Sequence, residues 1–178
     1  MSRFRREDWL KLSLAQLGKA GPSALTVQAL CEAASRTRGS LYHHFPDHDA
    51  LLDAVVAHWA SQHTTAVIDE VGPEGHAGHL NDLALALDLD VEVAMRQLVA
   101  RHPRLAPALA AVDRTRMGFL TTLHRERHGE EAEVVAKVEY AAFLGFQQLE
   151  PRPSREEMTA LYRRFEELIS LQEQSDES

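Results

Sequence analysis

Proline and glycine residues divide this chain into segments, and the apolar residues inside the segments recur at helical spacing. The breaks fall at Gly21-Pro22, Pro46, residues 72–78, Pro103, Gly129 and residues 151–153. An α-helix buries side chains at i, i+3, i+4 and i+7 on one face, and Met158, Leu161, Tyr162 and Phe165 follow this spacing. No run alternates polar with β-branched residues between turns. The sequence therefore predicts an all-α protein.

Helix starts are marked by residues whose side-chain oxygens can accept hydrogen bonds from the unpaired N–H groups of the first turn. These residues are Thr26, Thr37, Asp47 and Ser154, the last with Glu157 in a capping box. With the breaks, they indicate about nine helices, each uncertain by a few residues. The expected ranges are 6–20, 26–34, 37–43, 47–70, 79–88, 91–101, 104–128, 130–149 and 155–172.

The composition is that of an ordinary globular protein, with 44% hydrophobic and 26% charged residues in 178. No stretch approaches the roughly 18 apolar residues of a membrane span, and no apolar segment follows the basic start as in a secretory signal. The single cysteine, Cys31, fits a reducing compartment and is interpreted as an apolar packing residue. We therefore expect a cytoplasmic protein.

The net charge of −8 is unevenly distributed. Residues 1–46 hold seven basic and three acidic residues, whereas residues 47–178 hold 12 basic and 24 acidic ones. Phosphate binding needs a basic face and not a basic chain. The distribution therefore permits nucleic-acid binding by the N-terminal part.

Residues 26–43 predict two very short helices joined by a tight link at Ser35-Arg36. Helices this short are unstable alone and must dock on longer neighbours. Two of them around a tight turn are typical of a helix-turn-helix, whose second helix enters the major groove of DNA. The exposed face of that helix offers hydrogen-bonding side chains: Thr37, Arg38, Ser40, Tyr42 and His43.

These residues resemble the DNA-binding domain of TetR/AcrR-type transcriptional regulators. The resemblance rests on Thr26-Val27, on Arg38-Gly39-Ser40-Leu41-Tyr42-His43-His44-Phe45, and on Asp49-Ala50-Leu51-Leu52, with Cys31 and Ala34 as a packing pair. It covers residues 6–60 well. It implies a three-helix helix-turn-helix domain at 1–46 and a helical effector-binding and dimerisation domain at 47–178.

Three positions depart from the family pattern. Ser35 stands where glycine is usual, Arg36 where a buried aliphatic residue is usual, and His48 where a phosphate-binding lysine is common. Arg36 either extends to solvent or adds a DNA contact, and His48 should bind phosphate more weakly and with pH dependence. The expected DNA-contacting residues are Thr26, Arg36, Thr37, Arg38, Gly39, Ser40, Tyr42, His43 and His48.

Residues 134–149 are apolar on almost every side of the expected helix. In a chain of this size, such a helix suggests that a second subunit covers one face, and the amphipathic helix at 155–172 would complete the interface. A large monomeric core is the alternative. The expected interface residues are Tyr140, Phe143, Phe146, Leu161, Phe165 and Leu168.

The resemblance implies a homodimeric repressor that binds a palindromic DNA operator and is released by a small apolar or amphipathic effector. Pockets for such molecules are mostly apolar with few polar anchors, and a solid core is the alternative for these helices. The expected effector residues are Trp59, Gln62, Met95, Arg96, Met117, Leu120 and Tyr140.

Other classes of function find little support in the sequence. There is no glycine-rich phosphate loop, GxSxG or HExxH motif, so we expect neither an enzyme nor a cofactor. No histidine pair has a third ligand at metal-site spacing, and His124 and His128 are interpreted as part of a solvated helix end. The alternative function is a helical protein–protein interaction module that does not bind DNA.

Overall fold

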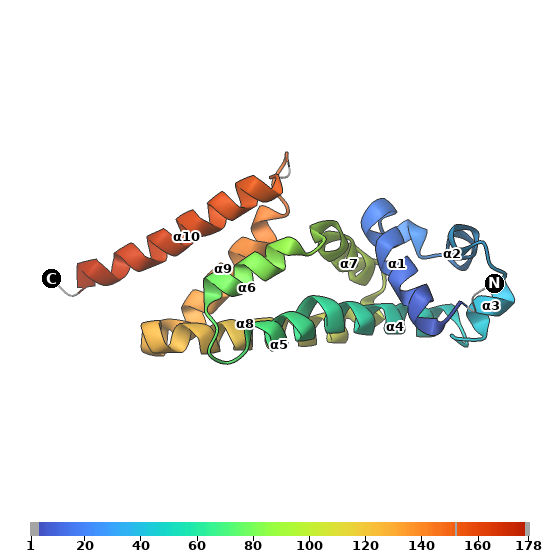
Figure 1. Ribbon diagram of the computed structural model, residues 1–178, viewed down its shortest axis with the longest axis horizontal. Helices are drawn as coiled ribbons and strands as arrows, with labels where there is room; N and C mark the ends of the chain where they lie inside the picture. The colour runs from blue at the N-terminus through green and yellow to red at the C-terminus, as the bar shows by residue number, and fades with distance from the viewer. Residues whose placement is uncertain (1–3, 152, 177–178) are drawn as a thin grey trace. The chain divides into compact units, whose positions relative to one another are not determined.

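The computed structural model describes residues 4–151 and 153–176, and within these ranges it is helical without a strand (Figure 1). The helices are α1 Arg6–Ala20, α2 Val27–Ala34, α3 Arg38–Tyr42, α4 His48–Ala60, α5 Ala66–Val71, α6 Ala77–Ala86, α7 Leu89–Arg101, α8 Ala106–His128, α9 Ala132–Phe146 and α10 Arg155–Asp176. The all-α prediction is confirmed. None of these helices is both long and apolar enough to cross a membrane.

Helix boundaries differ from the sequence expectation where short non-α turns intervene. The helix expected at 47–70 contains a π-helical turn at Ser61–Thr65, which joins α4 to α5. Turns of 3-10 helix at Pro103–Leu105 and Gly129–Glu131 precede α8 and α9, so both helices begin two residues later than expected. Proline suits the first position of such a turn because its missing N–H would have no partner there.

The predicted helix caps are present. The Thr26 hydroxyl accepts a hydrogen bond from the Ala29 backbone N–H (3.2 Å), and the Asp47 carboxylate accepts one from Ala50 (2.7 Å). Ser154 and Glu157 form the reciprocal capping box, and the backbone and side-chain hydrogen bonds of Ser154 lower the pKa of Glu157. These local bonds explain why the starts of α2, α4 and α10 could be predicted from the sequence.

The chain divides into two compact units, and the first contains the residues up to Thr65 together with Asp88–Val112. Its core is a continuous apolar cluster drawn from α1, α2, α3, α4 and α7, in which Trp9, Leu17, Leu41 and Trp59 are fully buried. Helix α1 packs against α7 at Gly18, where an added Cβ would lie 2.9 Å from Val91 Cγ2. Glycine at this position therefore sets how closely the two helices approach.

The second unit contains Ala66–Leu87 and the residues from Asp113 onward. Its core cluster of Leu120, Ala136 and Tyr140 is smaller, and half-buried neighbours including Met117 and Phe143 pack against it. The first unit extends well beyond residue 46, so compact packing does not coincide with the functional division at 46/47. That division concerns which part contacts DNA, and it stays a prediction.

Candidate nucleic-acid interface

Helices α2 and α3 lie together as two short helices joined by a three-residue turn (Figure 1). The turn closes through hydrogen bonds from Ser35 N–H to Glu32 O (3.0 Å) and from Arg36 N–H to Cys31 O (2.9 Å). Ser35 adopts the left-handed conformation, with φ 51° and ψ 47°. This is the backbone that favours glycine, so the serine keeps the geometry of the turn at some cost in energy.

Helix α3 is short, and its position depends on buried side chains. Leu41 and Phe45 point into the core of the first unit, where Leu30 of α2 is also fully buried. The Thr37 hydroxyl caps α3 by accepting a hydrogen bond from Ser40 N–H (3.3 Å). Core packing and capping together hold a helix of five residues that would not form alone.

Most of the expected DNA-contacting residues are exposed on this motif. Tyr42 is 46% exposed, and Arg38 and His43 are also exposed on α3. The remaining exposed members are Thr26, Thr37 and Gly39, whereas Arg36, Ser40 and His48 are half-buried. The structure thus brings hydrogen-bonding side chains from α2, the turn and α3 into one short region, as a DNA-reading surface requires.

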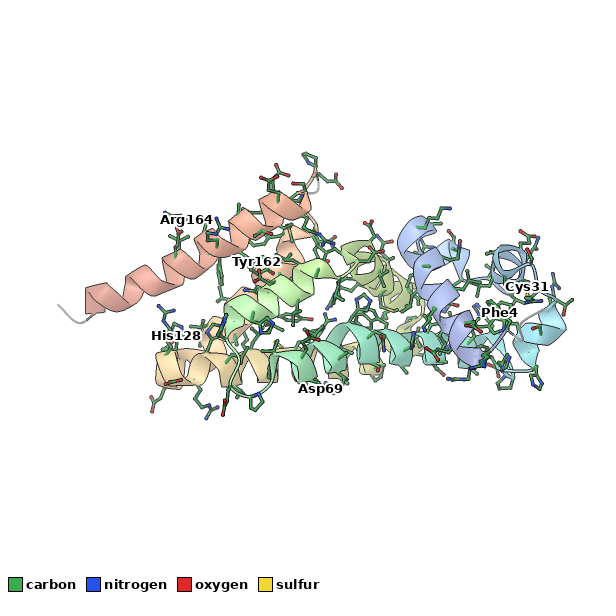
Figure 2. The ribbon with its side chains drawn as sticks, in the orientation of Figure 1. Phe4, Cys31, Asp69, His128, Tyr162 and Arg164 are labelled. Carbon is green, nitrogen blue, oxygen red and sulfur yellow. The ribbon has the colours of Figure 1, made fainter. Side chains whose placement is uncertain are left out.

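Arg36 has a structural partner that the sequence analysis did not identify. Its guanidinium lies over the ring of Phe4, 5.6 Å from the centroid, and Phe4 packs edge-on against Trp9. His44 Nε2 donates to the carbonyl of Phe4 (3.2 Å). The side chains of Phe4 and Cys31 are labelled in Figure 2. These contacts attach the start of the chain to the helix-turn-helix.

His48 also has a partner within the domain. Its Nε2 donates to the carbonyl of Leu25, 2.6 Å away, in the segment that precedes α2. The predicted contact of His48 with phosphate would therefore have to use the other ring nitrogen.

A groove of about 590 Å³ lies beside the turn. Besides Arg36, Thr37 and Arg38, it is lined by Gln28 and Glu32 of α2, which are hydrogen-bonded to each other (2.9 Å). Neither α2 residue was among the expected contacts, although both are exposed and one helical turn apart. Burial raises the pKa of the Cys31 thiol, which also lines this groove, and Arg38 opposes that shift.

The expected effector residues fall in both units. In the first, Trp59 and Met95 are fully buried, Gln62 is exposed, and Arg96 pairs with Glu92 on α7 (2.9 Å). In the second, Met117, Leu120 and Tyr140 share one cluster. The Tyr140 hydroxyl donates to Asp113 (2.7 Å) and accepts from Arg116 (3.3 Å).

The second unit contains a buried polar network that the sequence analysis missed. Glu139 of α9 is 2% exposed, and its carboxylate accepts hydrogen bonds from Asn81 of α6 (3.0 Å) and from His124 of α8. The expectation of a solvated helix end was therefore wrong for His124, which is buried. Polar residues on three separate helices meet here, and their spacing in the sequence carries no signal of it.

Tyr162 of α10 is buried in the same unit and is labelled in Figure 2. Burial raises the pKa of its hydroxyl, and Glu139 and Tyr140 add to the effect. Its ring packs edge-on against Phe146, with centroids 5.6 Å apart. Within the described ranges, no group of three or more His, Cys, Asp or Glu side chains could hold a metal ion.

The expected interface residues occupy different environments within the subunit. Tyr140 is buried, Phe143, Phe146, Leu161 and Phe165 are half-buried, and Leu168 is 50% exposed. Helix α9 also exposes Val134 (54%) and Val138 (50%), one turn apart, and Ala141 continues this stripe. This apolar stripe at i, i+4 and i+7 is visible in the sequence, beside the larger aromatic residues of α9.

The chain resembles known proteins in part of its sequence and in its fold. Residues 10–55 match the family model of bacterial regulatory proteins, tetR family. No curated protein sequence matches the chain.

Solved structures share the fold. A transcriptional regulator (TerR/AcrR family) from Aquifex aeolicus superposes with a TM-score of 0.76 at 13% identity, over 92% of this chain and 98% of that one. SmeT, the repressor of the Stenotrophomonas maltophilia multidrug efflux pump SmeDEF, gives 0.64 at 18% identity, over 89% and 86%. The multidrug binding protein EbrR, complexed with malachite green, gives 0.63 at 19% identity, over 90% and 97%.

At these identities the solved structures show a common fold, whereas the match at residues 10–55 is one of sequence. The matched residues run from α1 into α4 and include the whole helix-turn-helix. Residues 10–55 therefore match the tetR family of bacterial regulatory proteins in sequence, and the chain shares its all-helical fold with solved transcriptional regulators.

Proposed function

We propose that the protein is a cytoplasmic, ligand-responsive transcriptional repressor that binds a palindromic operator as a homodimer and has no enzymatic activity. The observation that carries the proposal is the exposure of Thr37, Arg38, Tyr42 and His43 on a capped helix-turn-helix anchored by Leu41 and Phe45. Two copies related by a two-fold axis would present two such helices, which matches a palindrome.

Different exposed side chains would contact different parts of the DNA. Arg38 can donate two parallel hydrogen bonds to the major-groove edge of guanine, and so would read sequence. The hydroxyls of Thr26 and Tyr42 would instead hold phosphates, which positions the domain without reading bases. His48, held through Nε2 by the Leu25 carbonyl, would contribute a weaker phosphate contact.

Binding selection on duplexes with randomised palindromic half-sites tests this assignment. We expect Arg38→Ala to lose about 1–3 kcal/mol per half-site and to relax preference at one base position. Tyr42→Phe should weaken all sequences alike. Arg125→Ala is the matched control, because Arg125 is an exposed arginine on α8, outside the motif. The same base preference in Arg38→Ala would disprove the reading role, and failure to select any duplex would favour a protein–protein module.

We also propose that α9 and α10 form the homodimer interface. The exposed apolar stripe of Val134, Val138 and Ala141 on α9, with Leu168 on α10, supports this. The half-buried residues Phe143, Phe146, Leu161 and Phe165 would flank the contact, and Tyr140 would support it from inside.

Light scattering of single-residue variants tests the interface. Val138→Glu places a charge on an exposed stripe without disturbing the core, so we expect a folded monomer that has lost operator binding. Lys137→Gln is the control, since Lys137 is the exposed neighbour paired with Glu133 (2.6 Å). A monomeric unmutated protein at micromolar concentration, or a Val138→Glu variant that stays dimeric, would contradict the proposal.

The effector would be a small apolar or amphipathic molecule that releases the operator. The residues expected to contact it are Trp59, Gln62, Met95, Arg96, Met117, Leu120 and Tyr140. The known binding of malachite green by EbrR, a protein of the same fold, suggests this dye as a probe. We expect it to raise the melting temperature and to dissociate the operator complex. Tyr140→Phe should reduce both effects, whereas equal effects in this variant would exclude Tyr140 as an anchor.

A further inference from the structure

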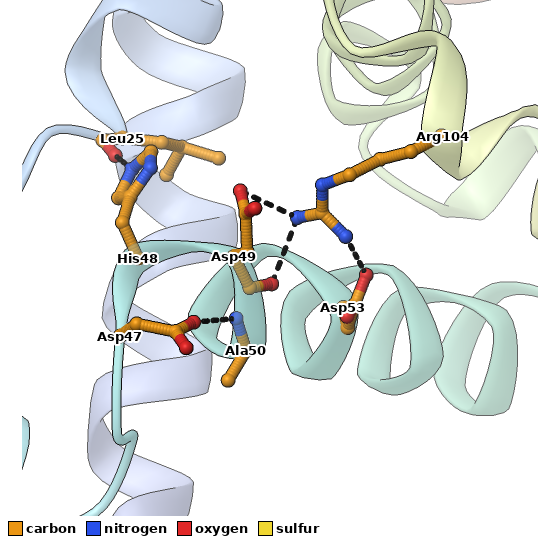
Figure 3. Close-up of polar contacts among 7 residues, drawn as sticks. All are labelled: Leu25, Asp47, His48, Asp49, Ala50, Asp53 and Arg104. Carbon is orange, nitrogen blue, oxygen red and sulfur yellow. Dashed lines mark hydrogen bonds and ion pairs between the residues drawn. The ribbon is translucent and has the colours of Figure 1, made fainter.

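Arg104 connects two parts of the first unit that are distant in sequence (Figure 3). Its Nη1 donates to Asp53 Oδ1 (2.5 Å), and its Nη2 lies 3.0 Å from Asp49 Oδ1 and donates to the backbone carbonyl of Asp49 (2.9 Å). One guanidinium therefore holds two carboxylates one turn apart on α4 and a carbonyl of the same helix. Arginine suits this arrangement because its planar fork offers several donors in fixed directions.

The residue that makes this contact is itself held in place. Arg104 lies in the 3-10 turn Pro103–Leu105 between α7 and α8, and the next residue, Leu105, is buried in the core of the first unit. Helix α8 begins at Ala106 and carries Met117 and Leu120, two of the expected effector residues. Arg104 therefore lies in the turn that directly precedes α8.

The other end of the connection reaches the helix-turn-helix. Arg104 contacts the first two turns of α4 (Figure 3). The same end of α4 is capped by Asp47, and there His48 donates a hydrogen bond to the Leu25 carbonyl. Leu25 directly precedes Thr26, the residue that caps α2. A shift of α4 along its axis would therefore strain this hydrogen bond of 2.6 Å between the start of α4 and the segment before α2.

A purely stabilising role does not account well for this contact. The side chains of Arg104, Asp49 and Asp53 are 36%, 65% and 59% exposed. Ion pairs at this exposure contribute little to global stability, because water screens them and both side chains lose freedom. Their geometry can still select one position of a helix over another.

We propose that Arg104 is a positioning residue for DNA binding, which fixes α4 so that α2 and α3 hold the orientation that fits the operator. The inference rests on the proposed function, since it needs an operator to act on. It assigns a role in operator affinity to a residue that lies outside the helix-turn-helix and touches no expected DNA contact.

The test compares operator affinities by fluorescence anisotropy, on a duplex selected with the unmutated protein. Arg104→Ala should bind up to about tenfold more weakly, because the proposed dimer loses the contact in both subunits, and this is within the range seen for residues that act on a site without contacting its ligand. Its melting temperature should fall by no more than about 2 °C, as for other exposed ion pairs. Arg101→Ala is the matched control for lost positive charge, because Arg101 is exposed at the end of α7 near the same turn.

A charge exchange separates positioning from nonspecific damage. The double variant Arg104→Asp, Asp53→Arg can re-form the ion pair with reversed partners, and we expect it to recover most of the lost affinity. Arg104→Ala combined with Asp53→Ala should be no weaker than Arg104→Ala alone, since both remove the same contact.

Three results would overturn the inference while leaving the proposed function intact. Arg104→Ala could bind like Arg101→Ala, the charge exchange could fail to restore affinity, or the loss could scale with a large fall in melting temperature. Failure of the unmutated protein to select any duplex is a different outcome, which would refute the proposed function and this inference with it.

Discussion

The two compact units differ in where they place polar and apolar groups. The first surrounds Trp9, Leu41 and Trp59 with a continuous apolar core and keeps the expected DNA-contacting groups at its surface. The second buries Glu139 and His124 in its interior, and exposes an apolar stripe on α9.

The two units therefore specify their cores in different ways. Apolar packing in the first unit is nondirectional, so stability there depends on volume and on the area removed from water. The network of the second unit is directional, because each buried polar group needs a partner in a defined place. We therefore expect substitutions to destabilise the first unit by leaving cavities, and the second by leaving buried polar groups without their partners.

The largest effect should come from breaking the buried network of the second unit. Glu139→Ala removes the shared acceptor and leaves Asn81 and His124 buried without it, so we expect a loss of about 3–5 kcal/mol in the free energy of unfolding. Urea denaturation measures it. His124→Ala should add little to Glu139→Ala in the double variant, because both disrupt one network. A cost below about 1 kcal/mol would contradict the importance of directional bonds there.

The matching change in the first unit should cost slightly less. Leu41→Ala leaves a cavity beneath α3, and a fully buried leucine lost in this way typically costs about 2–5 kcal/mol, with about 3 expected. Lys19→Ala in the last turn of α1 is the control, because Lys19 is exposed, and it should change stability by less than about 0.5 kcal/mol. If Leu41→Ala were as mild as its control, the core assigned to the first unit would be wrong.

Close helix packing gives a third comparison between the units. In Gly18→Ala the new Cβ would meet Val91 Cγ2 at 2.9 Å, so we expect a net loss of about 1–2 kcal/mol from overpacking. Gly118→Ala on α8 has no atom within 4 Å and should gain up to about 1 kcal/mol from helix propensity. Thermal unfolding of both variants tests this, and equal shifts in their melting temperatures would show that α1 and α7 do not pack tightly at Gly18.

The smallest effect concerns the turn of the helix-turn-helix. Ser35→Gly relieves the left-handed backbone at φ 51°, and should raise the free energy of unfolding by about 0.5–1 kcal/mol. Ser61→Gly lies at an ordinary helical φ of −61° and should lower it by a similar amount. Chemical denaturation of the pair tests this, and a loss in Ser35→Gly would mean that the serine side chain stabilises the turn.

Features of the fold that depend on nearby residues could be predicted from the sequence. Caps at Thr26 and Asp47 act within three residues, and the helix-turn-helix lies within one short stretch, so their patterns are visible in the order of residues. Contacts over long distances in the sequence were missed. Asn81 and Glu139 are 58 residues apart, and Arg104 and Asp53 are 51 apart, so only the folded chain reveals that they meet.

The candidate DNA-binding site divides in the same way. Its exposed residues on α3 follow from helical spacing, whereas the partners of Arg36 and His48 depend on tertiary packing. The sequence does not distinguish a half-buried arginine that faces DNA from one that lies over an aromatic ring. Its contact with Phe4 could be found only from the structure.

We expect α2, the turn and α3 of the first unit to bind a specific DNA sequence. The most direct measurement titrates the unmutated protein against its selected palindrome and a scrambled duplex, over a series of salt concentrations. We expect the palindrome to bind about 10³-fold more tightly or better, and the affinity for both duplexes to fall steeply as salt rises. Equal affinity for the two duplexes, or no binding to either at low salt, would contradict it.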